Sequence, residues 1–431
     1  MKKIIFTIFG FLFFTGEIMA AILSDVEIKG TKVPLIFEEN KALPIVSMQI
    51  VFQNSGQLSS KKDGLVSLSA ALLNEGTKKS GSVGYAAKLD DKAISISSYA
   101  GRENFVIVLN CLKSEFKSAV SLLEELLKDP NYTDDALSKV KMQKLGWLEQ
   151  KKSDFDYQGA LTLRQNIFEG SALAREYEGT PKSIKSISLD EIKDFIHSHL
   201  GYNNAIMVIG GDLKLDDAKS ITKNILLLLP HVDPKILPKI KASDKEIIKY
   251  NHNSDTQQAY IYFGAPFDFD YSSNEQYKAK VMEYILGGGG FGSRIMEEIR
   301  VKRGLAYSAY ASLQRTKSAS YLSGYLQTKL ENEDKAKELI KEVIRDFITN
   351  GITQKELDEA KEFLVGSEAL RVETLSQRLN RAFDDYYHGR PLGFSAEQNK
   401  LIQSVTLKEM NEFIASHKEI TKLSFGIVTK K

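Results

Sequence analysis

The sequence predicts an α+β fold of two homologous domains, each a mostly antiparallel sheet packed with helices on one face. Three observations lead to this prediction: an internal repeat, hairpin patterns that do not alternate regularly with helices, and a cluster of prolines at mid-chain. Strands and helices in such a non-alternating order are typical of α+β domains. A chain of 431 residues is long enough for two domains with substantial cores.

The repeat is clearest at two predicted helix starts, residues 188–199 and 406–417. They share six of twelve positions at an offset of 218, which is 406 minus 188. Each begins with a hydroxyl residue, Ser188 or Thr406, followed three positions later by Glu, the capping-box pattern of a helix N-terminus. A similar match upstream has nearly the same offset. We interpret this as an internal duplication rather than a solenoid.

The elements of each half follow from hydrophobic periodicity. The first half is predicted to contain two strands at residues 33–37 and 45–52, a hairpin at 94–112, an amphipathic helix at 113–128 and a closing strand at 205–209. The second half repeats this series with a strand at residues 258–265, a hairpin at 307–328, an amphipathic helix at 332–349 and a closing strand at 423–428.

Three of the nine prolines, Pro230, Pro234 and Pro238, lie within nine residues. Proline fixes φ and lacks an N–H, so this segment is not expected to form a helix or an inner strand. We therefore expect a first domain at residues 22–229, a linker at 230–244 and a second domain at 245–431.

The N-terminus has the layout of a bacterial secretory signal peptide, which we assign to residues 1–21. Lys2 and Lys3 precede an apolar run that is about half the length of a membrane-spanning helix. We expect cleavage after Ala20 or Ala21 and a periplasmic or secreted protein, with an uncleaved anchor as the alternative. The single cysteine in the chain permits no internal disulfide.

The charge balance is close to neutral, with 58 Lys and Arg against 56 Asp and Glu. No block of like charge is long enough to bind a polyanion, so we expect no nucleic-acid partner. No second segment is apolar enough to cross a membrane. The six histidines include no pair with the spacing of a zinc-binding helix.

The most informative stretch is residues 64–77, GLVSLSAALLNEGT. It resembles the helix that carries the inverted zinc motif of the insulinase and mitochondrial processing peptidase family, Gly-x-x-His-x-x-Glu-His-x-x-x-x-Gly-Thr. In this chain Ser67, Ala70 and Ala71 stand at the ligand, base and ligand positions. A hydroxyl and two methyl groups cannot hold Zn²⁺. We therefore expect no metal in this chain, and the plain interpretation of the stretch is an amphipathic core helix.

The resemblance also implies where a third zinc ligand would fall. In the family a carboxylate about 75 residues further on completes the site, which corresponds here to Trp147 and Leu148, with Glu149 close by. The best alternative metal pair, His197 and His199, lies two apart on a predicted helix and points to different sides. We expect His199 and its repeat partner His417 to lie at helix C-termini.

A second motif follows in the other half, where Gly287, Gly288, Gly289 and Gly290 precede a predicted helix. A phosphate-binding loop would require a preceding strand and a Lys-Ser or Lys-Thr pair, neither of which is present. A flexible connector that permits close packing is the other interpretation.

This second stretch is similar to the glycine loop, helix and Arg-x-x-x-x-x-x-Tyr element in the C-terminal half of the same family. Arg300 and Tyr307 match that pair. The resemblance implies that they donate hydrogen bonds to substrate carbonyls, where charge develops in the transition state. The alternative is that Arg300 pairs with Glu297 and that Tyr307 merely begins a strand.

The resemblance therefore implies a non-catalytic, substrate-binding subunit of an exported heterodimeric zinc metallopeptidase. A homologous partner would carry the zinc, and the domains would close as a clam shell around peptide substrates. Peptides would bind in part by adding a strand to an open sheet edge. The alternatives are an inert scaffold and a peptide-binding homodimer of the same fold.

Overall fold

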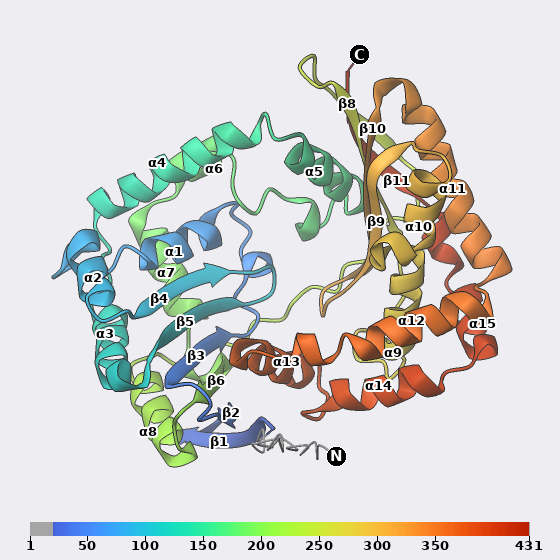
Figure 1. The fold of residues 1–431 in the computed structure, drawn as a ribbon. Helices are drawn as coiled ribbons and strands as arrows, with labels where there is room; N and C mark the ends of the chain where they lie inside the picture. Colours follow the sequence, from blue (N-terminus) through green and yellow to red (C-terminus); the bar gives the residue numbers. More distant parts are fainter. Residues whose placement is uncertain (1–19, 431) are drawn as a thin grey trace, which may run out of the picture.

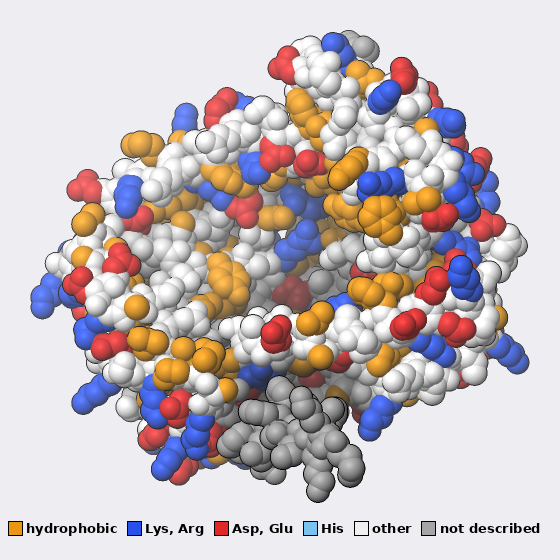
Figure 2. Space-filling model, in the orientation of Figure 1, with side chains coloured by type: hydrophobic (Ala, Val, Ile, Leu, Met, Phe, Trp, Pro, Cys, Tyr) orange, Lys and Arg blue, Asp and Glu red, His pale blue; other side chains and the backbone are white. Residues whose placement is uncertain are grey.

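The computed structural model describes residues 20–430, which form two halves (Figure 1) around a hollow (Figure 2). The predicted signal peptide lies outside the described residues except for Ala20 and Ala21. No helix among residues 20–430 is both long enough and apolar enough to span a bilayer.

The first half is built on a six-stranded sheet in the order β1-β2-β6-β3-β5-β4. Only β2 and β6 run parallel, and the other neighbours are antiparallel. The strands are β1 (Ile22–Ile28), β2 (Thr31–Glu39), β3 (Ile45–Phe52), β4 (Ser95–Ala100), β5 (Phe105–Leu112) and β6 (Ala205–Gly211).

The second half repeats five of these strands in the order β7-β11-β8-β10-β9. Again one pair is parallel, β7 with β11, and it has the same position in the sheet as β2 with β6. The strands are β7 (Ile248–His252), β8 (Gln258–Pro266), β9 (Ala306–Arg315), β10 (Ser320–Lys329) and β11 (Ser424–Thr429). The shared order and directions agree with the predicted duplication. β1 has no counterpart, and both β1 and β7 were missed in the sequence.

The helices of the two halves follow the same plan. Those of the first half are α1 (Leu65–Leu73), α2 (Gly81–Asp90), α3 (Phe116–Lys128), α4 (Asp134–Lys151), α5 (Phe155–Ile167), α6 (Pro181–Ser186), α7 (Leu189–His199) and α8 (Leu215–Leu226). Those of the second half are α9 (Gln276–Glu283), α10 (Arg294–Met296), α11 (Glu333–Asn350), α12 (Gln354–Gly366), α13 (Leu375–Tyr387), α14 (Phe394–Ser404) and α15 (Leu407–Ser416). Both predicted capping boxes, at Ser188 and Thr406, are formed and begin α7 and α15.

Each sheet packs one face on helices of its own half, as predicted. The structure adds that the second face of each sheet receives a helix from the other half. α13 packs Leu375 and Leu379 against apolar residues of the first sheet, and its Arg378 pairs with the buried Glu38 at 2.7 Å. Reciprocally, α5 packs on β8 and β11, and Asn166 donates to the Phe425 carbonyl at 3.1 Å. This exchange ties the halves together (Figure 1).

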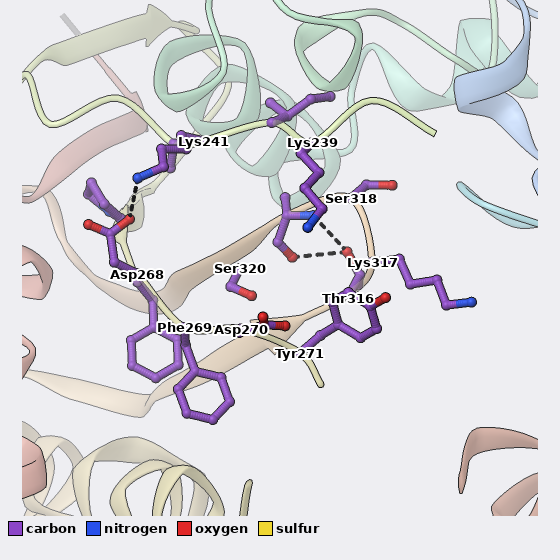
Figure 3. A pocket seen from close by; sticks show the side chains of 15 residues that line it. Lys239, Lys241, Asp268, Phe269, Asp270, Tyr271, Thr316, Lys317, Ser318 and Ser320 are labelled. Carbon is purple, nitrogen blue, oxygen red and sulfur yellow. Dashed lines mark hydrogen bonds and ion pairs between the residues drawn. The ribbon is translucent and has the colours of Figure 1, made fainter. Parts of the chain in front are cut away.

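Residues 230–246, between α8 and β7, contain neither helix nor strand. Part of this segment, residues 239–242, lines a cavity of about 300 Å³ together with residues 266–271 and the β9–β10 turn. Figure 3 shows Lys241 directed toward Asp268, with a nitrogen-to-oxygen distance of 3.2 Å, and Lys317 directed away. None of the predicted site residues lines this cavity.

Candidate functional site

The helix of the degenerate zinc motif, α1, brings Ser67 next to two charged side chains. The Ser67 hydroxyl donates to Glu178 Oε2 at 2.9 Å, and Lys144 Nζ donates to Ser67 Oγ at 3.0 Å. Lys144 and Glu178 also form an ion pair with each other. A lysine, a serine and one carboxylate thus converge at the position that corresponds to a zinc ligand.

A close backbone approach brings Glu178 to α1. Gly64, the residue before α1, has a φ of 81°, and a Cβ there would lie 3.0 Å from Gly179 Cα. The Gly64 amide also donates to the Tyr177 carbonyl at 3.2 Å. Two glycines therefore let the loop of residues 177–179 reach the start of α1.

Burial raises the pKa of Glu178, but Lys144, Ser67 and Gln57 outweigh it and hold that pKa below its usual range. Glu178 is therefore a carboxylate at neutral pH, and Lys144 compensates its charge. Lys144 Nζ also lies 4.5 Å from the centre of the Trp147 ring. The cluster is electrostatically satisfied and provides no metal ligand set. Among residues 20–430, no group of three or more His, Cys, Asp or Glu side chains could hold a metal ion.

The residue of α4 that reaches Ser67 is Lys144, one turn before the predicted region. Trp147 packs edge-on against Tyr157 with ring centres 5.6 Å apart, and Leu148 is buried in an apolar cluster. Glu149 is exposed and pairs with Lys152 at 2.6 Å. Glu149 is thus engaged with Lys152, and Lys144 is the α4 residue that bonds to Ser67.

The other two motif positions, Ala70 and Ala71, pack in the core as the amphipathic interpretation predicts. One turn further on, Asn74 caps the edge strand β4. Its side chain accepts from the Ser98 amide at 2.7 Å and donates to the Ser98 carbonyl at 2.9 Å. The edge of β4 beside the motif is therefore partly closed to an added strand.

The histidines take structural positions. His199 ends α7 as expected and stacks on Phe195 with ring centres 4.2 Å apart. Burial lowers the pKa of His199, which favours its neutral form. His417 follows α15, with Nδ1 2.8 Å from Glu419 Oε1. His197 lines a different cavity from His199, which agrees with their pointing to different sides.

The glycine loop packs tightly against β9. A Cβ on Gly287 would collide with the backbone of Ala311, and one on Gly289 would lie 2.8 Å from the Tyr284 carbonyl. Gly290 has a φ of 57°, in the left-handed region that favours glycine, and has open space beside it. Gly288 is less confined. Close packing and an unusual turn account for these glycines, so their contact with substrate stays a prediction.

Arg300 lies in a π-helical turn, Glu297–Val301, and stacks between two exposed aromatic rings. Its guanidinium carbon lies 4.4 Å from the centre of the Tyr307 ring and 4.6 Å from that of Phe291. Phe291 and Tyr307 are 65% and 82% exposed. Glu297 does not pair with Arg300, and the ion pairs of this turn connect Glu298 with Lys302 and Arg303 instead. The half-buried guanidinium is thus held against the exposed Tyr307 ring.

The two predicted sites belong to opposite halves that face each other across the hollow (Figure 1). Figure 2 shows this side of the molecule hollowed between the halves, with basic and hydrophobic side chains gathered there. The arrangement offers hydrogen-bond donors and aromatic surface to a ligand. It lacks the residues that would bind and activate water through zinc at α1.

Such a fold with these residues at the motif defines a metallopeptidase-like chain rather than a metallopeptidase. Residues 37–180 match the family described as insulinase (peptidase family M16), and residues 186–364 match the peptidase M16 inactive domain. The chain belongs to the M16 peptidase family, as the sequence motifs predicted.

One relative is the "non-peptidase homolog YmxG" of Helicobacter pylori, 45% identical over all of this chain and 99% of its own length. Among solved structures, a peptidase M16 inactive domain from Pseudomonas fluorescens superposes with a TM-score of 0.88 at 23% identity, covering 95% of this chain and 98% of that one. A protease from Helicobacter pylori has a TM-score of 0.81 at 14% identity, covering 95% and 100%. These two structural likenesses establish the fold alone.

Proposed function

We propose that this chain is the non-catalytic, substrate-binding subunit of an exported heterodimeric zinc metallopeptidase. Its partner is a homologous chain with an intact His-x-x-Glu-His helix, which supplies zinc and activates water. The observation that carries the proposal is the stack of the half-buried Arg300 guanidinium on the exposed Tyr307 ring. A guanidinium and a phenol so held are suited to donate to a peptide carbonyl whose oxygen gains charge.

The absence of zinc ligands at α1 supports the assignment of the zinc chemistry to a second chain. Ser67, Lys144 and Glu178 form a satisfied cluster that leaves no role for zinc in this subunit. The Helicobacter pylori relative is named a non-peptidase homologue, and a protease of the same fold comes from the same species. A chain of this kind and a protease of its fold therefore occur together in one organism.

Export is part of the proposal and rests on the N-terminal segment. β1 begins at Ile22, so cleavage after Ala20 or Ala21 leaves every strand of the first sheet intact. Fractionation of cells with N-terminal sequencing of the released protein tests this step. A cytoplasmic protein that retains its first twenty residues would contradict export without affecting the rest of the proposal.

The decisive experiment uses the chain alone, the zinc-bearing homologue from the same genome alone, and the two together. We expect a quenched peptide to be cleaved at a substantial rate only by the mixture, and a chelator to abolish that cleavage. A stable complex should elute from size exclusion at the mass of both chains. Chelator-sensitive cleavage by this chain alone would refute the proposal.

An inert scaffold or a peptide-binding homodimer is the second candidate, and one observation favours the scaffold. Asn74 occupies the outward hydrogen-bonding groups of Ser98, so a peptide cannot pair with β4 along its whole edge. If the chain is a scaffold, Arg300→Ala leaves the activity of the two-chain assembly unchanged. If it is a homodimer, the native protein elutes at twice its own mass with no second chain.

A further inference from the structure

A cavity of about 220 Å³ between the two halves contains two arginines and several tyrosines. Arg102, Tyr157, Arg164 and Tyr177 come from the first half, and Tyr262 and Tyr321 come from the second. The cavity is large enough for a single side chain or a chain end and too small for a folded ligand. It does not include Arg300, Tyr307 or the α1 motif.

The two arginines line one cavity, and neither forms an ion pair with an acid among residues 20–430. Seven other arginines form ion pairs within residues 20–430, namely Arg175, Arg294, Arg303, Arg315, Arg378, Arg381 and Arg390. Arg102 donates instead to the Tyr321 hydroxyl at 2.8 Å. Its guanidinium therefore keeps donors that no carboxylate in the described chain uses.

Arg164 projects from α5 and stacks on the Tyr177 ring, with its guanidinium carbon 4.2 Å from the ring centre. One terminal nitrogen donates to the Arg175 carbonyl at 3.3 Å. Its Nε is buried and has no hydrogen-bond partner among residues 20–430. Because no carboxylate among residues 20–430 pairs with this guanidinium, a ligand that brings an anionic acceptor into the cavity is favoured.

The acidic side chains near the cavity do not pair with either arginine. Asp156 accepts from the Tyr262 hydroxyl at 3.0 Å. Burial raises the pKa of Glu176, and Arg164 offsets this only in part without forming an ion pair with it. Two positive charges therefore remain without a paired acid, next to hydroxyl donors and aromatic rings.

We propose that this cavity binds a carboxylate of the peptide substrate, either an Asp or Glu side chain or the C-terminal carboxylate. Arg164 and Arg102 are its ion-pair partners, because guanidinium groups present donors in a fork that matches a carboxylate. The ligand bridges the halves, since Arg164 lies in the first and Tyr321 in the second. This inference rests on the proposed function and adds a preference for acidic peptides.

The test exposes the immobilised full chain to pools of random hexapeptides and measures the retained peptides by mass spectrometry. One pool contains Asp and Glu, a second has Asn and Gln in their place, and each is prepared with a free and an amidated C-terminus. We expect wild type to retain carboxylate-bearing peptides about tenfold over their neutral counterparts, as for a hydrogen-bonded charge. The four pools separate the side-chain source from the terminal one.

Three variants complete the design. Arg164→Gln should lose the preference and still retain neutral peptides, and Arg164→Lys should keep part of it. Arg345→Gln removes an exposed arginine of α11 and should behave as wild type. Unchanged melting temperatures establish that each variant is folded.

Peptide retention without a carboxylate preference in wild type, or a preference that survives in Arg164→Gln, would overturn the subsite and leave the proposed function standing. No retention of any peptide by wild type would overturn both.

Discussion

Lys144 of α4 and Glu178 of the loop before α6 form an ion pair that includes the hydroxyl of Ser67. The two residues are 34 positions apart, and they meet at the helix position that holds a zinc ligand in active relatives. An ion pair and a hydroxyl therefore occupy the position at which this chain has no zinc ligand.

Restoring the histidines alone should not restore metal binding. In the variant Ser67→His with Ala71→His, the Lys144 ammonium lies where a cation would bind, so it repels Zn²⁺. Adding Lys144→Glu removes this repulsion and supplies a carboxylate. We expect the triple variant to bind Zn²⁺ at least about tenfold more tightly than the double variant, by calorimetric titration. Lys144→Glu alone serves as the control and should bind none. Equal affinities would show that Lys144 does not block the site.

The ion pair also predicts a dependence of stability on pH. The pKa of Glu178 is lower in the folded chain than in the unfolded one, so the folded state binds fewer protons. The contribution of ionised Glu178 to the free energy of unfolding is present above its unfolded pKa of about 4.3. It is lost as the pH falls through its folded pKa. Glu178→Gln should lower the free energy of unfolding by on the order of 2 kcal/mol at pH 7.

Urea denaturation of wild type and Glu178→Gln at pH 7 and near pH 3 measures this effect. The difference between the two proteins should shrink at the lower pH, since Glu178 of the unfolded wild type is then protonated and unfolding is favoured by that proton uptake. Glu149→Gln, at an exposed position of α4, is the control and should change little. A difference that stays constant across this range would contradict the assigned role.

The Arg300–Tyr307 stack predicts loss of activity without loss of stability. Tyr307 is 82% exposed, so Tyr307→Phe keeps the ring that stacks on Arg300 and removes only the hydroxyl. In the two-chain assembly, we expect each of Tyr307→Phe and Arg300→Ala to lower kcat about 100-fold, as for removal of one oxyanion donor. Arg303→Ala, two residues beyond the π-helical turn of Arg300, tests whether the loss of any nearby positive charge has this effect. Full activity of both site variants would favour the scaffold.

The exchange of helices predicts that a substitution in the second half weakens the first. Leu379 of α13 is fully buried against the first sheet, and Leu379→Ala should cost about 2–5 kcal/mol. Hydrogen exchange of the β2 and β6 amides should increase in this variant. Leu370→Ala, at an exposed position, is the control. Unchanged protection of the first sheet would show that α13 does not support it.

The sequence alone was sufficient for the repeat, for the hairpins and closing strands of each half and for the absence of zinc ligands in the motif, but not for β1 and β7. Periodicity and capping residues act over a few positions, so the hairpins and the starts of α7 and α15 could be read directly. Residue type alone excludes zinc at α1, because serine and alanine offer no ligand.

Only the tertiary structure decided which helix faces pack on which sheet faces. An amphipathic helix shows that one face is buried and not what buries it, so the packing of α5 and α13 on the opposite sheets could not be foreseen. The same holds for Lys144 with Glu178 and for Arg102 with Arg164. These side chains come together through close approach of distant backbone segments, and no local pattern in the chain records such contacts.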